Sequence, residues 1–183
     1  MYAINNNGEL AGVVSQVAGY YENGAFQTIG AIPGNFLSTA YGLNDNGDIC
    51  GVSDYERGNY QHAFLYHNGS VQDLGTLAPN TSSLAQGVNN SGVVIGQSAH
   101  QPFVYQNGAM QNLFSLVDPS LGYTNGIATA INNNGWIVGS SNQGAFLAIP
   151  HASAVPEPCS LLTFGVGIGV LFLVARRRKF RSA

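Results

Sequence analysis

A run of alternating amide and carboxylate side chains is the first part of this chain that could do chemistry. Asn44-Asp45-Asn46-Gly47-Asp48 places oxygen atoms on alternate residues before a glycine, as the first half of a calcium-binding loop does. Calcium also needs a bidentate acid further along such a loop, and the matching runs 89–93 and 132–136 contain no acid at all. We therefore interpret the motif as a backbone turn, and we expect neither a metal nor a cofactor.

The other residue types that carry out catalysis occur without a recognisable arrangement. The histidines lack the spacing of a zinc site such as His-Glu-x-x-His, and we interpret all four as surface residues: His62, His67, His100 and His151. No Gly-x-Ser-x-Gly elbow of a serine hydrolase is present. Paired carboxylates for glycoside hydrolysis need to meet only in space, but most acids here lie in expected turns. We expect a non-catalytic protein with no catalytic residue, and a glycan-active enzyme is the alternative.

Aromatic side chains are numerous for a chain in which only 8% of residues are charged. Exposed Tyr and Trp rings stack on sugar faces, and Asn side chains can hydrogen-bond to sugar hydroxyls. The same rings could instead fill the core between neighbouring sheets. The residues in question are Tyr20, Tyr21, Tyr55, Tyr60, Tyr66, Tyr105, Tyr123 and Trp136.

Residues 154–183 combine a proline-rich motif, an apolar run and a basic cluster. The run 159–175 is 17 residues without a charge, and a helix of that length spans about 26 Å, close to the roughly 30 Å hydrocarbon core of a bilayer. The sequence therefore predicts a transmembrane helix over 159–175. The basic residues that follow should stay in the cytoplasm as a stop signal within the tail 176–183. They are Arg176, Arg177, Arg178, Lys179 and Arg181.

This orientation places residues 1–155 outside the cytoplasm, joined to the membrane by a linker over 151–158. Pro156 and Pro158 favour extended backbone, the form that proteases and transpeptidases bind. The order of Pro156-Glu157-Pro158, apolar helix and basic cluster resembles the PEP-CTERM protein-sorting signal of bacteria that make exopolysaccharide. The resemblance implies that a membrane enzyme, exosortase, recognises the motif at the inner membrane and removes the tail, leaving the protein at the cell surface or secreted. A plain single-pass membrane anchor is the alternative.

Charge is divided unevenly between this tail and the rest of the chain. Before Glu157 there are eight acidic residues and one basic residue, Arg57, a formal charge of −7. Such an acidic region cannot neutralise phosphates, so no nucleic-acid partner is expected. Cys50 and Cys159 lie in different regions and should not form a disulfide. The first residues do not resemble the signal peptide that export requires, so we expect a truncated chain or a start inside a longer reading frame.

Two motifs alternate along residues 1–150. The first motif consists of an apolar residue, the turn sequence Asn-x-x-Gly and a strand that ends in Gly. We call the first Asn of each copy its leading asparagine. The leading asparagines are spaced by 39, 45 and 43 residues: Asn5, Asn44, Asn89 and Asn132. Asn tolerates a left-handed backbone and Gly takes a positive φ, so each copy predicts a tight hairpin. The second motif has a Phe-containing strand, an Asn-Gly turn and an alternating strand, and occurs at 62–75, 101–113 and, incompletely, at 21–30 and 144–147.

Each pair of motifs predicts a unit of four short antiparallel strands, with units near 3–38, 39–84, 85–128 and 129–150, the last ending after its third strand. Repeated four-stranded units of this length are typical of β-propeller blades. The predicted fold class is therefore all-β and β-propeller-like, a partial or four-bladed ring, plus one C-terminal transmembrane helix. A β-solenoid is the alternative, and the propeller is preferred because the rungs of a solenoid are shorter than these units. Small residues should allow strands to pack closely near a central axis, and phenylalanines should fill the space between sheets: Gly12, Gly51, Gly96 and Gly139; Phe64, Phe103 and Phe146.

The second motif resembles the HAF repeat of extracellular bacterial proteins. His62-Ala63-Phe64 carries the triplet that names the repeat, whereas Gln101-Pro102-Phe103 and Gly144-Ala145-Phe146 depart from it and the first copy lacks the Phe. The resemblance covers about residues 3–149. It implies an extracellular location and a repeat architecture but no activity, and together with the sorting signal it makes surface polysaccharide the candidate ligand.

Overall fold

The computed structural model describes residues 1–54 and 60–150, together with the backbone of residues 171–173. Within these residues the protein is all-β, as the sequence predicts, and each predicted repeat forms one antiparallel sheet. Strands that follow one another in the chain are hydrogen-bonded neighbours, so every unit is a simple meander.

The four sheets take their strands in sequence order. The first contains β1 (Ala3–Ile4), β2 (Leu10–Val14), β3 (Val17–Glu22) and β4 (Ala25–Gly30). The second contains β5 (Leu37–Leu43), β6 (Ile49–Asp54), β7 (His62–His67) and β8 (Ser70–Asp73). The third contains β9 (Ser83–Val88), β10 (Val94–Ser98), β11 (Gln101–Gln106) and β12 (Ala109–Asn112), and is followed by two short 3-10 helices, η1 (Leu113–Leu116) and η2 (Pro119–Leu121). The fourth contains β13 (Gly126–Ile131), β14 (Ile137–Ser141), β15 (Gly144–Pro150) and β16 (Leu171–Leu173).

The Asn-Gly hairpin turns form where the sequence predicts them. Between β7 and β8, Asn68 has φ +49° and Gly69 has φ +79°, the two positive values of a type I′ turn, which matches the twist of the flanking strands. The same geometry recurs at Asn23-Gly24 and Asn107-Gly108. Two further turns, at 15–16 and 99–100, also have positive φ at both residues without using glycine, and no turn motif in the sequence marks them.

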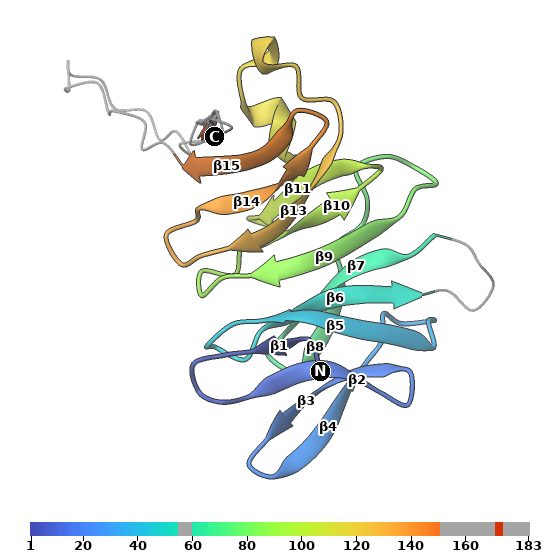
Figure 1. Ribbon diagram of the computed structural model, residues 1–183. Helices are drawn as coiled ribbons and strands as arrows, with labels where there is room; N and C mark the ends of the chain where they lie inside the picture. Colours follow the sequence, from blue (N-terminus) through green and yellow to red (C-terminus); the bar gives the residue numbers. More distant parts are fainter. Residues whose placement is uncertain (55–59, 151–170, 174–183) are drawn as a thin grey trace, which may run out of the picture.

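The sheets stack face to face in sequence order, from the first at one end to the fourth at the other (Figure 1). Three clusters of buried side chains hold the stack, one between each pair of consecutive sheets. Each cluster contains one phenylalanine of the second motif, so the predicted filling between sheets is confirmed: Phe64, Phe103 and Phe146 are 0%, 0% and 4% exposed. In the first unit Gly19 takes this place, and the ring of Phe26 lies against it.

The repeated glycines of the second strands are required by a close approach within each sheet. A Cβ added to Gly51 would lie 1.9 Å from the carbonyl oxygen of Thr39 on β5. The neighbouring strand bulges here, at Tyr41, which brings its backbone towards β6. The same contact recurs at Gly96 and Gly139. The predicted close packing is therefore present, but the partner is the adjacent strand rather than residues at a central axis.

The fourth sheet differs from the prediction in its last strand. The sequence predicts three strands for this unit and a helix over 159–175, whereas residues 171–173 form β16, antiparallel to β15 with Leu173 opposite Ala148. The edge of β15 offers unpaired backbone groups, and a short strand satisfies them. The remainder of the predicted helix, the linker 151–158 and the tail 176–183 lie outside the described residues. None of the helices in the described part is long and apolar enough to cross a membrane.

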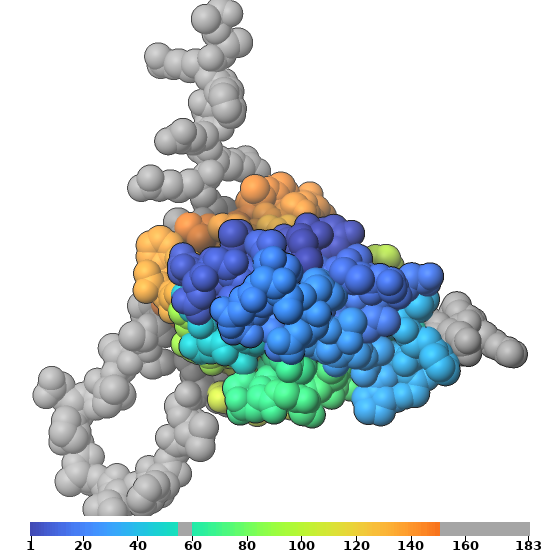
Figure 2. All heavy atoms as spheres, turned by 90° about the horizontal axis from the view of Figure 1, so that it is seen from below, coloured from blue at the N-terminus to red at the C-terminus, as the bar shows by residue number. Residues whose placement is uncertain are grey.

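The described units form an open stack rather than a closed four-membered ring. The first strands pack successively from unit to unit, β1 with β5, β5 with β9 and β9 with β13. Among the outermost strands of the described part, only β4 and β8 pack appreciably, so the sheets splay apart away from the first strands. Figure 2 looks onto one end of the stack, where the first unit (blue) lies uncovered in front of the others.

Candidate functional site

Each Asn-x-x-Gly turn is organised by the side chain of its leading asparagine. Oδ1 of Asn44 accepts the backbone N–H groups of Asn46 and Asp48, both at 2.9 Å. The backbone closes the same turn, because Gly47 donates to the Asn44 carbonyl. The same pair of side-chain contacts is made by Asn5, Asn89 and Asn132. One side chain thus satisfies two backbone donors in every turn.

The amide nitrogen of the same asparagine links one unit to the next. Nδ2 of Asn44 donates to the carbonyl of Asn89 at 2.9 Å, and Asn5 and Asn89 make the matching bonds at 3.1 and 3.2 Å. A second row runs beside the first, where the backbone N–H after each leading asparagine donates to a side-chain oxygen of the next unit. We call both rows the asparagine ladder: Asn5, Asn6, Asn44, Asp45, Asn89, Asn90, Asn132 and Asn133. The sequence predicts the turns but not these bonds between units.

Buried serines form further polar links between units that the sequence analysis missed. Oγ of Ser83, which is 2% exposed, accepts the N–H of Ala63 at 2.8 Å and donates to the carbonyl of Gly75 at 2.6 Å. Ser38 makes the equivalent two contacts with the first unit. Both serines stand six residues before a leading asparagine, and that common register was the signal available in the sequence.

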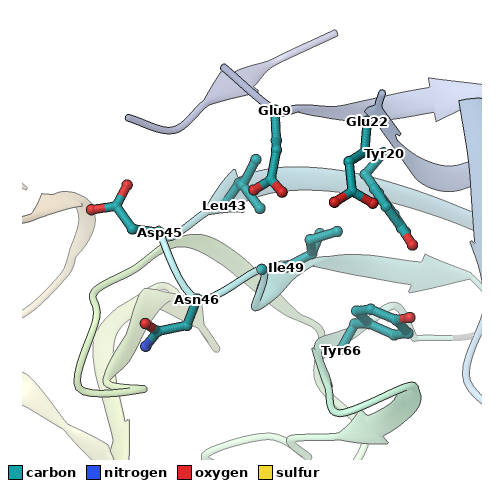
Figure 3. A pocket seen from close by; sticks show the side chains of 9 residues that line it. Glu9, Tyr20, Glu22, Leu43, Asp45, Asn46, Ile49 and Tyr66 are labelled. Atoms are coloured by element: carbon teal, nitrogen blue, oxygen red, sulfur yellow. The ribbon is translucent and has the colours of Figure 1, made fainter. Parts of the chain in front are cut away.

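A hollow of about 250 Å³ opens between the first two sheets, beside the ladder (Figure 3). The carboxylates of Glu9 and Glu22 point into it from the first unit. Tyr20 and Tyr66 border it with ring centroids 6.5 Å apart, and Asp45 lies at its rim with its carboxylate turned away. None of the described residues that line the hollow is Lys, Arg or His.

The two glutamates stand where the second unit has an acid and a histidine. Asp48 is the equivalent of Glu9, four residues after the leading asparagine, and its buried carboxylate pairs with Nδ1 of His67. Glu22 occupies the histidine's position, directly before the Asn-Gly turn. Glu9 accepts a hydrogen bond from Nδ2 of Asn5, while no described side chain donates to Glu22. The hollow between the first two sheets therefore holds two acids, Glu9 and Glu22, at positions where the second unit has an acid paired with a histidine.

The electrostatics of the hollow follow from this excess of acids. Burial raises the pKa of the Tyr20 hydroxyl, and the neighbouring Tyr66 and both glutamates raise that pKa further. Tyr20 therefore stays protonated and can donate a hydrogen bond, which it gives to Oε1 of Gln27 at 3.1 Å. Hydrogen bonds from the side chain of Asn90, and from Asn6, lower the pKa of Asp45. Asp45 therefore stays ionised and adds to the negative potential at the rim.

This arrangement suits a polar ligand that is neutral or positively charged. Carboxylates accept hydrogen bonds from hydroxyl and ammonium groups, and the tyrosine rings offer apolar surface to the C–H faces of a sugar. Phosphate, sulfate or uronate groups would be repelled, because no cationic side chain among the described lining residues offsets the acids. In residues 1–54 and 60–150, no three His, Cys, Asp or Glu side chains come together as a metal site.

The run 44–48 forms the predicted turn, and its acids are engaged by the protein itself. The carboxylate of Asp45 accepts hydrogen bonds from Asn6 and Asn90, and that of Asp48 from Asn44 and His67. The other histidine of the second motif, His62, lies at the opposite end of β7 and pairs with Asp73 at 2.9 Å.

The aromatic residues divide between packing and surface. Tyr105 is 7% exposed, and Tyr123 stacks on Phe114 with centroids 4.8 Å apart. Trp136 and Tyr60 are 45% and 46% exposed, and Tyr55 lies outside the described residues. Tyr20 and Tyr66 combine the two roles, since both pack against the first core cluster and border the hollow.

The residues of the predicted sorting signal fall outside the part of the chain that the structure describes. They are Pro156, Glu157 and Pro158 of the motif, and Arg176, Arg177, Arg178, Lys179 and Arg181 of the basic cluster. Comparison of the chain with protein-family models, with curated proteins and with solved structures gave no match. The two resemblances therefore rest on the motifs quoted above.

Proposed function

We propose that the protein is an exported, non-catalytic surface or matrix protein whose repeats bind exopolysaccharide in the hollow between the first two sheets. The observation that carries the binding role is a pair of glutamates beside a pair of tyrosines, with no basic side chain among the residues of the lining that the structure describes. The ligand is a neutral sugar or an amino sugar, because uronates and phosphorylated sugars would meet uncompensated carboxylates.

The export part of the proposal rests on residues 151–183. Pro156-Glu157-Pro158, an uncharged run and a basic cluster follow one another in the order of a PEP-CTERM signal. An exosortase-type enzyme is the partner, met in the inner membrane with the C-terminus in the cytoplasm, a state in which residues 171–173 lie in the membrane and not in β16. After processing, the repeats remain at the cell surface or are secreted, where polysaccharide is available to them.

We also propose that the stack is an arc of a β-propeller. Successive packing of the first strands, combined with the splaying of the outer strands, supports a common axis near β1, β5, β9 and β13. Bulges recur next to this axis in the last three units. In a stack of parallel, equally spaced sheets the outer strands would pack as closely as the inner ones.

A glycan-active enzyme is the second candidate, favoured by the two glutamates that meet in one hollow. Glycoside hydrolases use two carboxylates, one as an acid and one as a base or nucleophile. Incubation of an oligosaccharide that binds with the folded protein separates the candidates, since an enzyme releases shorter products and a binding protein returns the oligosaccharide intact.

The binding role is tested by calorimetric titration with three oligosaccharides, an amino-sugar oligomer, a neutral glucan and a uronate oligomer. A hydrogen bond to a charged group contributes about 1.5–3 kcal/mol, so Glu22→Gln should weaken amino-sugar binding about tenfold or more. Asp118→Asn is the matched control, because it removes an exposed acid far along the chain and still caps η2. Equal affinities of these two variants, or preferred binding of the uronate oligomer, would refute the assignment.

The sorting role is tested by the mass of the mature protein recovered from producing cells. The parent should lose its tail near residue 158, and a variant with Pro156, Glu157 and Pro158 changed to Ala should keep it. An intact tail in both proteins would indicate a plain membrane anchor instead.

A further inference from the structure

One apolar position of the repeat is buried inside the stack and uncovered at the end formed by the fourth sheet. It lies six residues after the leading asparagine and faces the following unit. Its first three copies are each 0% exposed: Ala11, Cys50 and Ile95. Val138, the fourth copy, is 43% exposed. Trp136, two residues before it, is 45% exposed, so the outer face of the fourth sheet presents apolar surface where the earlier sheets have a partner.

A second position shows the converse at the other end. It lies directly before the leading asparagine and faces the preceding unit. Its copies in the last three units each pack in one of the three core clusters: Leu43, Val88 and Ile131. Ile4, the first copy, is 69% exposed on the unit that lies uncovered in Figure 2. The two ends therefore present the two halves of the contact that occurs three times inside the chain.

The asparagine ladder is also incomplete at both ends, and in complementary ways. Nδ2 of Asn132 and the backbone N–H of Asn133 have no acceptor among the described residues, although both donors are used in the three earlier turns. The carbonyl of Asn44 accepts one hydrogen bond within its turn and a second from Nδ2 of Asn5 in the preceding unit. Among the described residues, the carbonyl of Asn5 accepts the bond within its turn alone. Oδ1 of Asn6 has no donor in the described part. Every donor missing a partner at one end has a matching acceptor at the other.

We propose that the two ends bind each other between copies, so that the fourth sheet of one chain docks on the first sheet of a second copy and continues the ladder. A second copy fits because this chain already contains the same interface three times, with apolar and amide partners in the same register. The contact is head to tail, joining different surfaces of the two copies. Such contacts close into rings when the rotation allows and otherwise form open chains.

The test uses the full chain in detergent, with mass measured by sedimentation at micromolar concentration. Ile4→Glu and Val138→Glu each place a charge on one face, at positions already exposed, and Ser70→Glu on the exposed β8 is the matched control. The parent and the control should self-associate, and each face variant alone should be monomeric. An equimolar mixture of the two face variants should form a 1:1 dimer, because it contains one intact copy of each face.

A second readout adds no charge to the fold. In a Cys159→Ser background, Ile4→Cys mixed with Val138→Cys should be joined by a short bifunctional maleimide, and neither variant should be joined to itself. Self-association retained by one face variant would indicate a symmetric contact, and retention by both would indicate association through another region. A monomeric parent would show that the two faces do not bind each other. Each of these three results would overturn the proposal.

Discussion

Replacing Asn44 by Ala should destabilise the protein far more than the same change at Asn132. Asn44 is 4% exposed, and its side chain makes four hydrogen bonds, two within its turn, one to the Asp48 carboxylate and one to the next unit. Leaving a buried polar group without its partner costs about 1–3 kcal/mol. Asn44→Ala removes a partner from two buried groups of Asp48, its backbone N–H and its carboxylate. We therefore expect the free energy of unfolding to fall by about 3–5 kcal/mol. Within the described part of the chain, the side chain of Asn132 makes the two turn contacts alone, at exposed residues, so its loss should cost about 1 kcal/mol.

The assay is urea unfolding of the full chain in detergent, followed by circular dichroism. Because repeat arrays are coupled through their nearest-neighbour interfaces, Asn44→Ala should also lower the dependence of the unfolding free energy on urea, as the units on either side begin to unfold separately. Equal free-energy losses for the two variants, with unchanged urea dependence, would show that the asparagines act only within their turns and would refute the ladder as a source of stability.

Three smaller predictions concern single positions. Gly51→Ala should cost about 3 kcal/mol or more of stability, since its Cβ would lie 1.9 Å from the Thr39 carbonyl oxygen. Gly87→Ala should be neutral or slightly stabilising, because its Cβ would lie in ordinary contact, 3.5 Å from Cδ1 of Ile95. Thermal unfolding of the two variants compares these effects. Hydrogen bonds from Asn90 and Asn6 lower the pKa of Asp45 in the folded protein. Asp45 therefore stabilises the fold above its unfolded pKa of about 3.9, and this contribution is lost as the pH falls through the lower folded pKa. Asp45→Asn should therefore make the free energy of unfolding depend less on pH below about pH 4, as acid unfolding would measure. Burial raises the pKa of the Cys50 thiol to about 12, so iodoacetamide at pH 8 should label the Cys50 peptide only after unfolding, as mass spectrometry would detect.

The local parts of this fold were accessible from the sequence because single residues determine them. Asn68-Gly69 forms its type I′ turn because these two residues tolerate positive φ. Phe64 recurs in register with a facing glycine, so its place between sheets follows from the repeat. Residues 171–173 were predicted to be helical from their apolar run, since hydropathy contains no information about the free edge of β15 that they satisfy.

The candidate site was not accessible in the same way, because it depends on which units become neighbours. Glu9 and Glu22 belong to different motifs and meet only when β2 pairs with β3. The pairing of two acids at these positions is recognised as unusual only when it is compared with Asp48 and His67, which form an acid–histidine pair at the equivalent positions. The sequence marks the tyrosines as candidates for sugar stacking or for core packing, and whether a ring packs or borders a hollow depends on the adjacent sheet. Alignment of the four units by their leading asparagines would have revealed the unusual pair of acids.

The ladder explains why the units can differ so much elsewhere. The phenylalanine of the second motif is replaced by Gly19 in the first unit, and the tyrosine that follows it by Ala148 in the last. Apolar positions tolerate such exchanges because neighbouring side chains, such as Phe26, fill the space. The leading asparagine has no such substitute, since it must accept two backbone N–H groups and donate across the interface with one planar amide. A carboxylate in its place would lack the donor, and an alcohol would be too short to reach both units. In the first three units the identity of this residue therefore follows from two simultaneous requirements, one within the turn and one between the sheets, and among the described residues Asn132 meets the first of them.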